Sequence, residues 1–340
     1  MKILVIRRDN IGDLVCTTPL FAALRQHYPH ARIDALVNSY NGPVLAGNPD
    51  LDHVYVYSKY KHVAATQSRI AWLRDRLALL WQLRRQKFDL IILAKSSFDQ
   101  HGLRFASQIG GRKILGFAPV DGRSADLDIA VSEGPGELEH EVELVFRLLS
   151  PLGIDASPGP LKVMPVRAAN VPAAAPTATV APIAIHISAR EAERQWPIDK
   201  WIGLTRQLLA ATTNPLMLLW APGSRNDPAH PGDDELATAL LDALSESERQ
   251  RVLPRPTRTL PELVVALSEA RLLICCDGGA LHIAAGLGKP VVGLFQNHPI
   301  KYNHWHPWGV PHRVVRSPVS RVEDIEVAAV TEATLSLLEA

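Results

Sequence analysis

The chain has 340 residues, which is long for a single domain and comfortable for two. It is 47% hydrophobic and 21% charged with a formal net charge of +1, so it has the composition of an ordinary globular protein and no overall charge that would attract nucleic acid. It contains no run of about 18 apolar residues that could span a membrane, and its three cysteines (Cys16, Cys275 and Cys276) suggest neither disulfides nor a metal pair, which favours a reducing, cytoplasmic compartment.

Short apolar runs alternate with helical patterns in the first half of the chain, as expected for parallel β-α-β units. The runs are nearly continuous in Val, Ile and Leu, which is typical of strands buried on both faces. A helix is expected at Thr18–His27, where apolar residues follow helical spacing. The expected strands are Lys2–Ile6, Ile33–Val37, His53–Tyr57, Leu90–Leu93 and Lys113–Gly116.

Residues 59–87 form a strongly basic segment, with eight Lys and Arg against the single acid Asp75. A basic amphipathic helix with tryptophans is typical of contact with an anionic partner or with a membrane surface. The alternative is a solvated helix whose apolar stripe packs on the N-terminal domain. The residues with rough helical spacing are Trp72, Leu73, Leu77, Leu80, Trp81 and Leu83.

An Ala- and Pro-rich stretch at 166–182 carries almost no charge and is expected to be a linker. The alternation then restarts, which predicts an α/β protein with two Rossmann-like domains (1–165 and 183–321) and a C-terminal helix (322–340). The two parallel sheets are expected to face a central cleft. The later strands are expected at Ile183–Ile187, Leu216–Trp220, Arg251–Leu253, Leu272–Cys276 and Val291–Phe295, and the last helix near Val322–Leu338.

The first candidate site is the turn Arg8–Pro19, which follows the first strand. We expect a loop through Gly12 and then a helix that opens at Thr18, and α/β sheets bind ligands at such turns. Asp13 places a carboxylate there, which makes it a candidate catalytic group. Alternatively, Asp13 caps the helix or pairs with Arg8.

The second candidate is the turn Asp277-Gly278-Gly279, which joins a buried strand to an Ala-rich helix. Glycines let the backbone approach a diphosphate, and the start of a helix offers free amides and a positive dipole. The segment is neither G-x-G-x-x-G nor a Walker A loop, which disfavours dehydrogenases and P-loop enzymes. An ordinary tight turn is the alternative.

The third candidate follows the strand that ends near His186. Ser188, Arg190 and Arg194 could bind phosphate oxygens. The alternative is a loop in which the arginines pair with the intervening glutamates.

A histidine-rich loop at 296–308 contains His298, His304 and His306. No carboxylate lies nearby and no known ligand spacing appears, so we expect no metal site there.

Together these segments resemble glycosyltransferase family 9, whose best-known members act on lipopolysaccharide. Arg8–Pro19, with its I-G-D and T-T-P elements, is similar to the opening of that family, and Arg194–Pro197 matches a basic residue placed just before its W-P. Asp277–His282 resembles the family's D-[ST]-G-x-x-H helix. The likeness continues, in the same order, through Ala284, Ala285, Gly288–Val292, Phe295 and Pro307–Gly309.

The resemblance implies a GT-B fold and an inverting, metal-independent transfer of heptose from the co-substrate ADP-heptose to the lipopolysaccharide inner core, with no cofactor. Asp13 matches the general base. Arg194 and the amides of Gly279 and Ala280 are expected to stabilise the departing diphosphate. The positions that match donor-binding residues are Asn10, Gly12, Ser188, Arg194, Asp277, Gly278, Gly279 and His282.

Gly278 and Ala189 stand where the family usually has hydroxyl residues, so another nucleotide-sugar stays open as the donor. Two other classes of protein also stay open. One is a nucleotide-sugar epimerase or hydrolase, and the other is a non-catalytic module that recruits partners through the basic segment 59–87.

Overall fold

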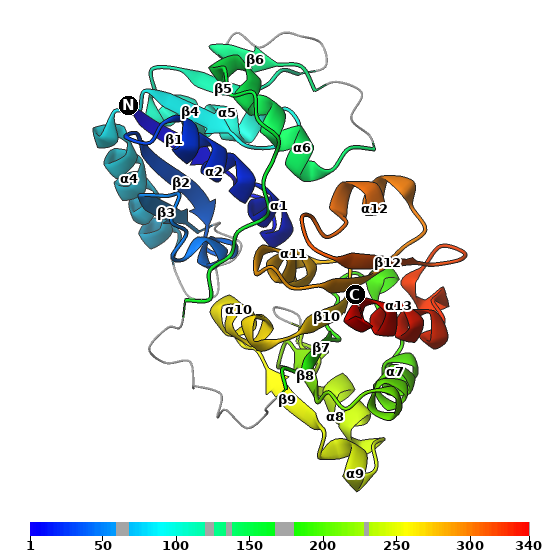
Figure 1. The fold of residues 1–340 in the computed structure, drawn as a ribbon. Coiled ribbons are helices and arrows are strands. Elements are labelled where there is room, and N and C mark those ends of the chain that lie inside the picture. The colour runs from blue at the N-terminus through cyan, green and yellow to red at the C-terminus, as the bar shows by residue number, and fades with distance from the viewer. Residues whose placement is uncertain (59–67, 120–125, 134–137, 167–179, 228–230, 340) are drawn as a thin grey trace. The chain divides into compact units, whose positions relative to one another are not determined.

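The structure, a computed structural model, describes residues 1–58, 68–119, 126–133, 138–166, 180–227 and 231–339 (Figure 1). It divides into two compact units, unit 1 (Met1–Leu161) and unit 2 (Lys162–Ala340). Most of the expected linker lies outside the described residues, and the predicted domain boundaries and central cleft stay predictions. Among the described helices, none is long and apolar enough to cross a membrane.

Unit 1 is built on a parallel sheet in the order β3-β2-β1-β4-β5-β6. Its central strand β1 pairs with β2 on one side and with β4 on the other. The order of the strands therefore reverses between β1 and β4, and doubly wound sheets bind ligands outside the carboxyl ends of the strands at such a switch point. The strands are β1 (Lys2–Ile6), β2 (Arg32–Asn38), β3 (His53–Tyr57), β4 (Leu90–Leu93), β5 (Ile114–Phe117) and β6 (Ile129–Val131).

Helices join these strands and cover the sheet, which is why β1, β4 and β5 are buried along almost their whole length. The helix α2 contributes Leu20, Phe21 and Leu24 to the core. The helical elements of unit 1 are α1 (Ile11–Cys16), α2 (Thr18–His27), η1 (Gly42–Leu45), α4 (Arg69–Gln86), α5 (Gln100–Ile109), α6 (Glu141–Phe146) and η2 (Arg147–Leu152).

Unit 2 repeats the same topology in the order β12-β11-β10-β7-β8-β9. All of its strand pairs are parallel, and the switch point lies between β7 and β10, where Ile274 pairs with Ile185. The strands are β7 (Ile183–His186), β8 (Leu216–Trp220), β9 (Val252–Pro256), β10 (Leu272–Cys276), β11 (Val291–Phe295) and β12 (His312–Arg316).

The final helix α13 packs on α7 and β12 and thereby closes one side of unit 2. Its Val330 and Leu337 belong to the core of this unit. The helical elements of unit 2 are η3 (Ala192–Arg194), α7 (Ile198–Ala211), α8 (Asp234–Asp242), α9 (Glu246–Arg249), α10 (Leu260–Glu269), α11 (Gly279–Gly286), α12 (Pro299–Trp305), η4 (Val322–Asp324) and α13 (Val327–Glu339).

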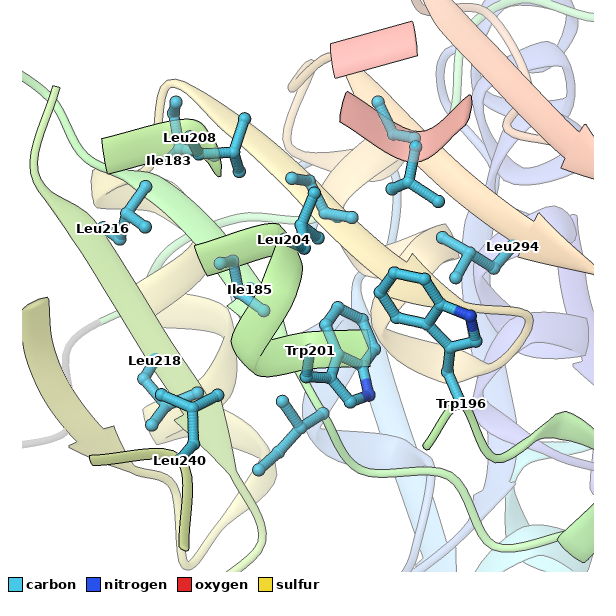
Figure 2. Packing of buried hydrophobic residues seen from close by; sticks show 14 of the residues in the cluster. Ile183, Ile185, Trp196, Trp201, Leu204, Leu208, Leu216, Leu218, Leu240 and Leu294 are labelled. Atoms are coloured by element: carbon cyan, nitrogen blue, oxygen red, sulfur yellow. The ribbon is translucent and has the colours of Figure 1, made fainter. Parts of the chain in front are cut away.

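The core of unit 2 surrounds two tryptophans, Trp196 and Trp201 (Figure 2). Their rings meet edge to face at 4.8 Å, a geometry in which the positive edge of one ring meets the negative face of the other. Leu204 of α7 lies on the side toward Trp201, and Leu208 lies farther along the same helix, near Ile183; both leucines are fully buried. The segment that carries Arg194 is therefore anchored in the core by its neighbour Trp196.

The strands and the helix Thr18–His27 predicted from the sequence are confirmed, with ends that shift by at most three residues. The elements that were not predicted include α1, α6, α12 and the strands β6 and β12. The prediction of a plain loop was wrong for 11–16, which forms α1, and for 299–305, which forms α12. The predicted last helix is a short 3₁₀ turn followed by α13.

The substitution Leu204→Ala should lower the free energy of unfolding of unit 2 by about 2–5 kcal/mol, because it removes a buried side chain and leaves a cavity. Denaturant unfolding would measure the change. The control is Val319→Ala, at a side chain that is 71% exposed, where the change should stay within about 0.5 kcal/mol. Equal effects of the two substitutions would contradict this account of the core.

Candidate active site

The candidate residues gather at the two switch points, one in each unit. In unit 1, Asn10, Gly12 and Asp13 follow β1. In unit 2, Ser188 and Arg194 follow β7, and the turn at Asp277 follows β10. The carboxyl ends of parallel strands meet at one edge of a sheet, so each group collects on the edge where such folds bind ligands.

Asp13 lies in the first turn of α1 rather than in a loop. Asn10 caps this helix and forms a capping box with Asp13, in which the backbone N–H of Asn10 donates to Asp13 Oδ2 at 3.0 Å. The alternative that Asp13 caps the helix opening at Thr18 is wrong, because Asp13 belongs to the capping box of α1 and Thr17 is the N-cap of α2. The expected partner Arg8 instead pairs with Asp99 at 3.2 Å.

Arg7 is the charged partner of Asp13. Its guanidinium is only 2% exposed and donates to Asp13 Oδ1 at 2.6 Å and to Glu141 Oε1 at 2.7 Å. A further hydrogen bond runs to the carbonyl oxygen of Ala94, at the end of β4. Arg7 therefore joins β1, α1, β4 and α6 around the switch point.

This arrangement keeps Asp13 ionised. Burial raises the pKa of Asp13, but the charge and hydrogen bond of Arg7 and the bonds from Asn10 outweigh it, so its pKa lies below the usual value. Burial by itself lowers the pKa of Arg7, but the carboxylates of Glu141 and Asp13 outweigh it, so the pKa of Arg7 is raised. The site thus holds a carboxylate at neutral pH, but one of low basicity.

Two asparagines fix the backbone of the turn before α1. The Asn38 amide group donates to the carbonyl oxygens of Arg8 and Asp9, both at 2.9 Å, and Asn41 donates to that of Asp9 at 3.2 Å. Asn38 ends β2, so the neighbouring strand holds the turn in place. Gly12 is buried in α1, whereas Asn10 is exposed.

In unit 2, Asp277 and Arg194 form an ion pair of 3.2 Å. The side chain of Asp277 is 7% exposed, and burial raises its pKa even though Arg194 and Lys301 lower it. Arg194 also pairs with Glu191 at 2.9 Å. Local pairing of Arg with Glu was the alternative interpretation of this segment. Arg194 makes such a pair with Glu191 and at the same time contacts Asp277 in the β10 turn.

The two residues after Arg194, Gln195 and Trp196, hold its segment in place. Trp196 donates its indole N–H to the carbonyl oxygen of Ile325 at 3.0 Å, and Gln195 bonds the carbonyl oxygen of Ala189 at 3.0 Å. The W-P element therefore has a structural role, because it fixes the position of the basic residue before it.

Ser188 and Arg190 differ in their surroundings. The Ser188 hydroxyl accepts a hydrogen bond from the backbone amide of Ala221 at 2.9 Å, so it connects the ends of β7 and β8. Burial raises the pKa of Asp233, and a hydrogen bond with Ser188 offsets part of that rise. Arg190 is exposed. Arg194 contacts the β10 turn through its ion pair with Asp277.

The turn at Gly278 has room for a side chain. A Cβ atom placed there would meet its nearest neighbour, the carbonyl oxygen of Cys276, at 3.9 Å, and the backbone is extended. A hydroxyl residue would therefore fit, and the backbone does not require the glycine. The helix α11 begins directly after it, and the amides of Gly279 and Ala280 lie in its first turn.

His282 is 2% exposed and packs against Trp305 with ring centroids 5.7 Å apart. It thus connects α11 to α12, and α12 contains His304. His306 follows α12 and bonds the carbonyl oxygen of Asn303. Among the described residues, no three His, Cys, Asp or Glu are grouped to hold a metal ion. The absence of a metal from the reaction stays a prediction.

Sequence reasoning missed Arg7, Glu141, Asn38 and Lys301. The N-x-x-D pattern at Asn10 and Asp13 is a capping signal that could have revealed α1. By contrast, Glu141 lies 134 residues from Arg7, and no local pattern indicates that pairing.

Comparisons with known proteins agree with this architecture. The model of a family described as glycosyltransferase family 9 (heptosyltransferase) matches residues 76–332. Lipopolysaccharide heptosyltransferase 3 of Escherichia coli is 24% identical over 323 residues, which cover 87% of this chain and 83% of that protein. Lipopolysaccharide heptosyltransferase 2 of Salmonella typhimurium is 25% identical over 312 residues, with 87% and 82% covered.

A solved structure of the E. coli heptosyltransferase WaaC with ADP-2-deoxy-2-fluoro heptose has the same fold. It superposes with a TM-score of 0.78 at 17% identity and covers 99% of both chains. The predicted α/β fold of the GT-B type is thus confirmed.

The substitution Arg7→Met should lower the free energy of unfolding by about 3–5 kcal/mol at neutral pH, because it leaves buried carboxylates without their counter-charge. The double variant Arg7→Met/Glu141→Gln should recover part of this loss. Without Arg7 the carboxylates have raised pKa values in the folded state, so they take up protons more readily as the pH falls. The difference in free energy of unfolding between Arg7→Met and the wild type should therefore shrink at lower pH. Urea unfolding at several pH values would measure both effects, and a double variant less stable than the single one would contradict the pairing.

Proposed function

Because the chain belongs to glycosyltransferase family 9, we propose that it transfers a heptose from ADP-heptose to an acceptor in the lipopolysaccharide core, with inversion and without a metal ion. As a member of that family it is a glycosyltransferase, which sets the epimerase and hydrolase alternatives aside. The family match carries the proposal. The placement of Asp13 and of the Asp277–Arg194 pair at the two switch points supports it.

The relatives supply the substrate classes of this proposal. Those with coverage above four-fifths are named lipopolysaccharide or lipooligosaccharide heptosyltransferases. A solved structure with the same fold contains an ADP-linked fluoro-heptose. A nucleotide-sugar donor and a lipopolysaccharide core acceptor are therefore the substrates we assign, and the cytoplasm is the compartment we expect.

In the proposed reaction an acceptor hydroxyl oxygen attacks the anomeric carbon of the donor from the face opposite the diphosphate. A new C–O bond forms, the bond to the diphosphate oxygen breaks, and that oxygen keeps the electron pair. The hydroxyl proton passes to the carboxylate of Asp13. ADP leaves as the free anion, and the configuration at the anomeric carbon inverts.

The contact with Arg7 affects the timing of the proton transfer. Asp13 is ionised and can accept a proton, but its lowered pKa gives little driving force while the acceptor is an ordinary alcohol. The acceptor oxygen becomes acidic as its bond to the anomeric carbon forms. We therefore infer that the proton moves late, after that bond is well developed.

Arg194 and α11 are assigned to the leaving group. The departing diphosphate gains negative charge, which a cationic fork and the free amides of Gly279 and Ala280 can stabilise. Asp277, beside Arg194, is assigned to the hydroxyls of the transferred sugar. Gly278 removes one side-chain hydroxyl from this turn, so a donor with another sugar or nucleotide is the second candidate.

The substitution Asp13→Asn should abolish turnover and leave donor affinity nearly unchanged, because it removes the proton acceptor and keeps the size of the side chain. Product formation and donor binding by calorimetry would measure the two effects separately. The matched control is Asp99→Asn, at a carboxylate of the same unit that pairs with Arg8. An undiminished rate in Asp13→Asn would exclude Asp13 as the base. A wild type without any turnover would instead favour a non-catalytic module.

Thermal stabilisation by ADP, GDP, UDP and ADP-heptose, without added metal, would identify the donor. We expect selective stabilisation by ADP and ADP-heptose. The variant Arg194→Gln should weaken ADP binding by about 1.5–3 kcal/mol, the usual effect of losing a charge-assisted hydrogen bond, whereas the exposed Arg190→Gln should have a smaller effect. Preference for another nucleotide would change the assigned sugar, and equal effects of both substitutions would contradict the assignment of Arg194.

A further inference from the structure

The helix α4 carries two apolar stripes, and only one of them packs on unit 1. Leu83 is fully buried, and Leu79 and Leu80 are partly buried against the core beneath them. Trp72 donates its indole N–H to the carbonyl oxygen of Ser58 at 2.8 Å. This inner stripe corresponds to the structural alternative considered for the basic segment, and it accounts for the docking of the helix.

The second stripe faces solvent. Ile70, Leu73, Leu77 and Trp81 are 82%, 49%, 57% and 60% exposed. Their spacing of three, four and four residues places them on one face of an α-helix, about 80° wide. Figure 1 shows α4 at the periphery of unit 1. An exposed row of large apolar side chains marks an interaction surface rather than a solvated face.

Arginines border this outer stripe. Arg74 is 80% exposed beside it, and Arg84 and Arg85 follow at its C-terminal end. The guanidinium of Arg85 lies 4.4 Å from the centre of the Trp81 ring, which keeps cation and aromatic ring together at the surface. Asp75 is the single acid in α4. The surface is therefore apolar along its middle and positive at its border.

We propose that this face of α4, defined by Ile70, Leu73, Leu77 and Trp81 with Arg74, Arg84 and Arg85, docks on the surface of an anionic lipid bilayer. The arginines would contact lipid phosphates while the apolar side chains enter the acyl boundary. A soluble phosphate compound would leave the apolar row in water. A second copy of the chain would bring two sets of arginines together, so charge complementarity favours the bilayer.

The helix would lie in the plane of the membrane. Its 18 residues extend about 27 Å, and the inner stripe keeps it attached to unit 1 throughout. Four side chains bury little area compared with a spanning helix, so the binding is expected to be reversible and sensitive to salt. This inference does not depend on the donor or on Asp13.

Flotation of the full chain with vesicles would test the proposal. We expect binding to phosphatidylcholine vesicles that contain phosphatidylglycerol and little binding to pure phosphatidylcholine. The variant Leu77→Gln/Trp81→Gln should lower the partition coefficient at least about tenfold. The variant Arg84→Gln/Arg85→Gln should lower it roughly 25-fold at low salt, since each cation near the surface contributes about fivefold.

Two matched controls lie in unit 2. Leu253→Gln/Val319→Gln removes two exposed apolar side chains, and Arg206→Gln/Arg249→Gln causes the same loss of net charge. Both should bind vesicles as the wild type does. Circular dichroism and thermal unfolding would show that every variant is folded, and sedimentation would record its oligomeric state.

Three results would overturn the proposal. One is a wild-type chain that does not bind anionic vesicles. Another is that the arginine variant loses binding while the Leu77→Gln/Trp81→Gln variant binds as the wild type does. That result would indicate attraction to phosphate without insertion of apolar side chains. The third is a dimer that dissociates on changing Leu77 and Trp81, which would assign the stripe to a second copy. None of these results would affect the proposed transfer reaction, because donor binding and turnover with a soluble acceptor are measured without lipid.

Discussion

The ion pairs of Arg7 are the constraint on which unit 1 depends most. A buried guanidinium is costly unless carboxylates surround it, and here Asp13 and Glu141 both lie within 2.7 Å. Asp13 lies in α1, close to Arg7 in sequence, but Glu141 lies in α6, 134 residues away, so the distant α6 must close on the end of β1. Hydrogen bonds from Asn38 then hold the intervening turn. The position of the candidate base is thus determined by residues that themselves have no chemical step to perform.

Both units contain the same motif, a carboxylate paired with an arginine at the switch point of an identical strand order. The two carboxylates nevertheless differ in the direction in which their pKa values move. Asp13 has a short bond from Arg7 and a second from Asn10, so its charge is stabilised. Asp277 is more deeply buried, and burial outweighs the charges of Arg194 and Lys301 there, so its charge is less stabilised. Equal topology therefore gives two different chemical environments.

Much of this fold could be predicted from sequence, because strands buried on both faces appear as apolar runs, such as Leu90–Leu93 and Leu272–Cys276. The missed strands β6 and β12 are short or half-exposed, so their composition is not distinctive. The candidate residues were found by their place after predicted strands, which local sequence can indicate. The partner of Arg7 in α6 could not be found, because a pairing across 134 residues exists only after folding. Similarly, the sequence of α4 does not indicate which apolar side chains pack on unit 1 and which face solvent, and only the folded structure separates the two stripes.

The closing position of α13 has a consequence for biosynthesis. Unit 1 is continuous in the chain, so on the ribosome it can complete its parallel sheet while unit 2 is still being made. In unit 2, α13 supplies Val330 and Leu337 to the core and covers α7 and β12. Until it emerges, that apolar flank has no cover, and such intermediates are prone to aggregate. Chaperones would therefore be needed most during the synthesis of unit 2, before α13 has emerged.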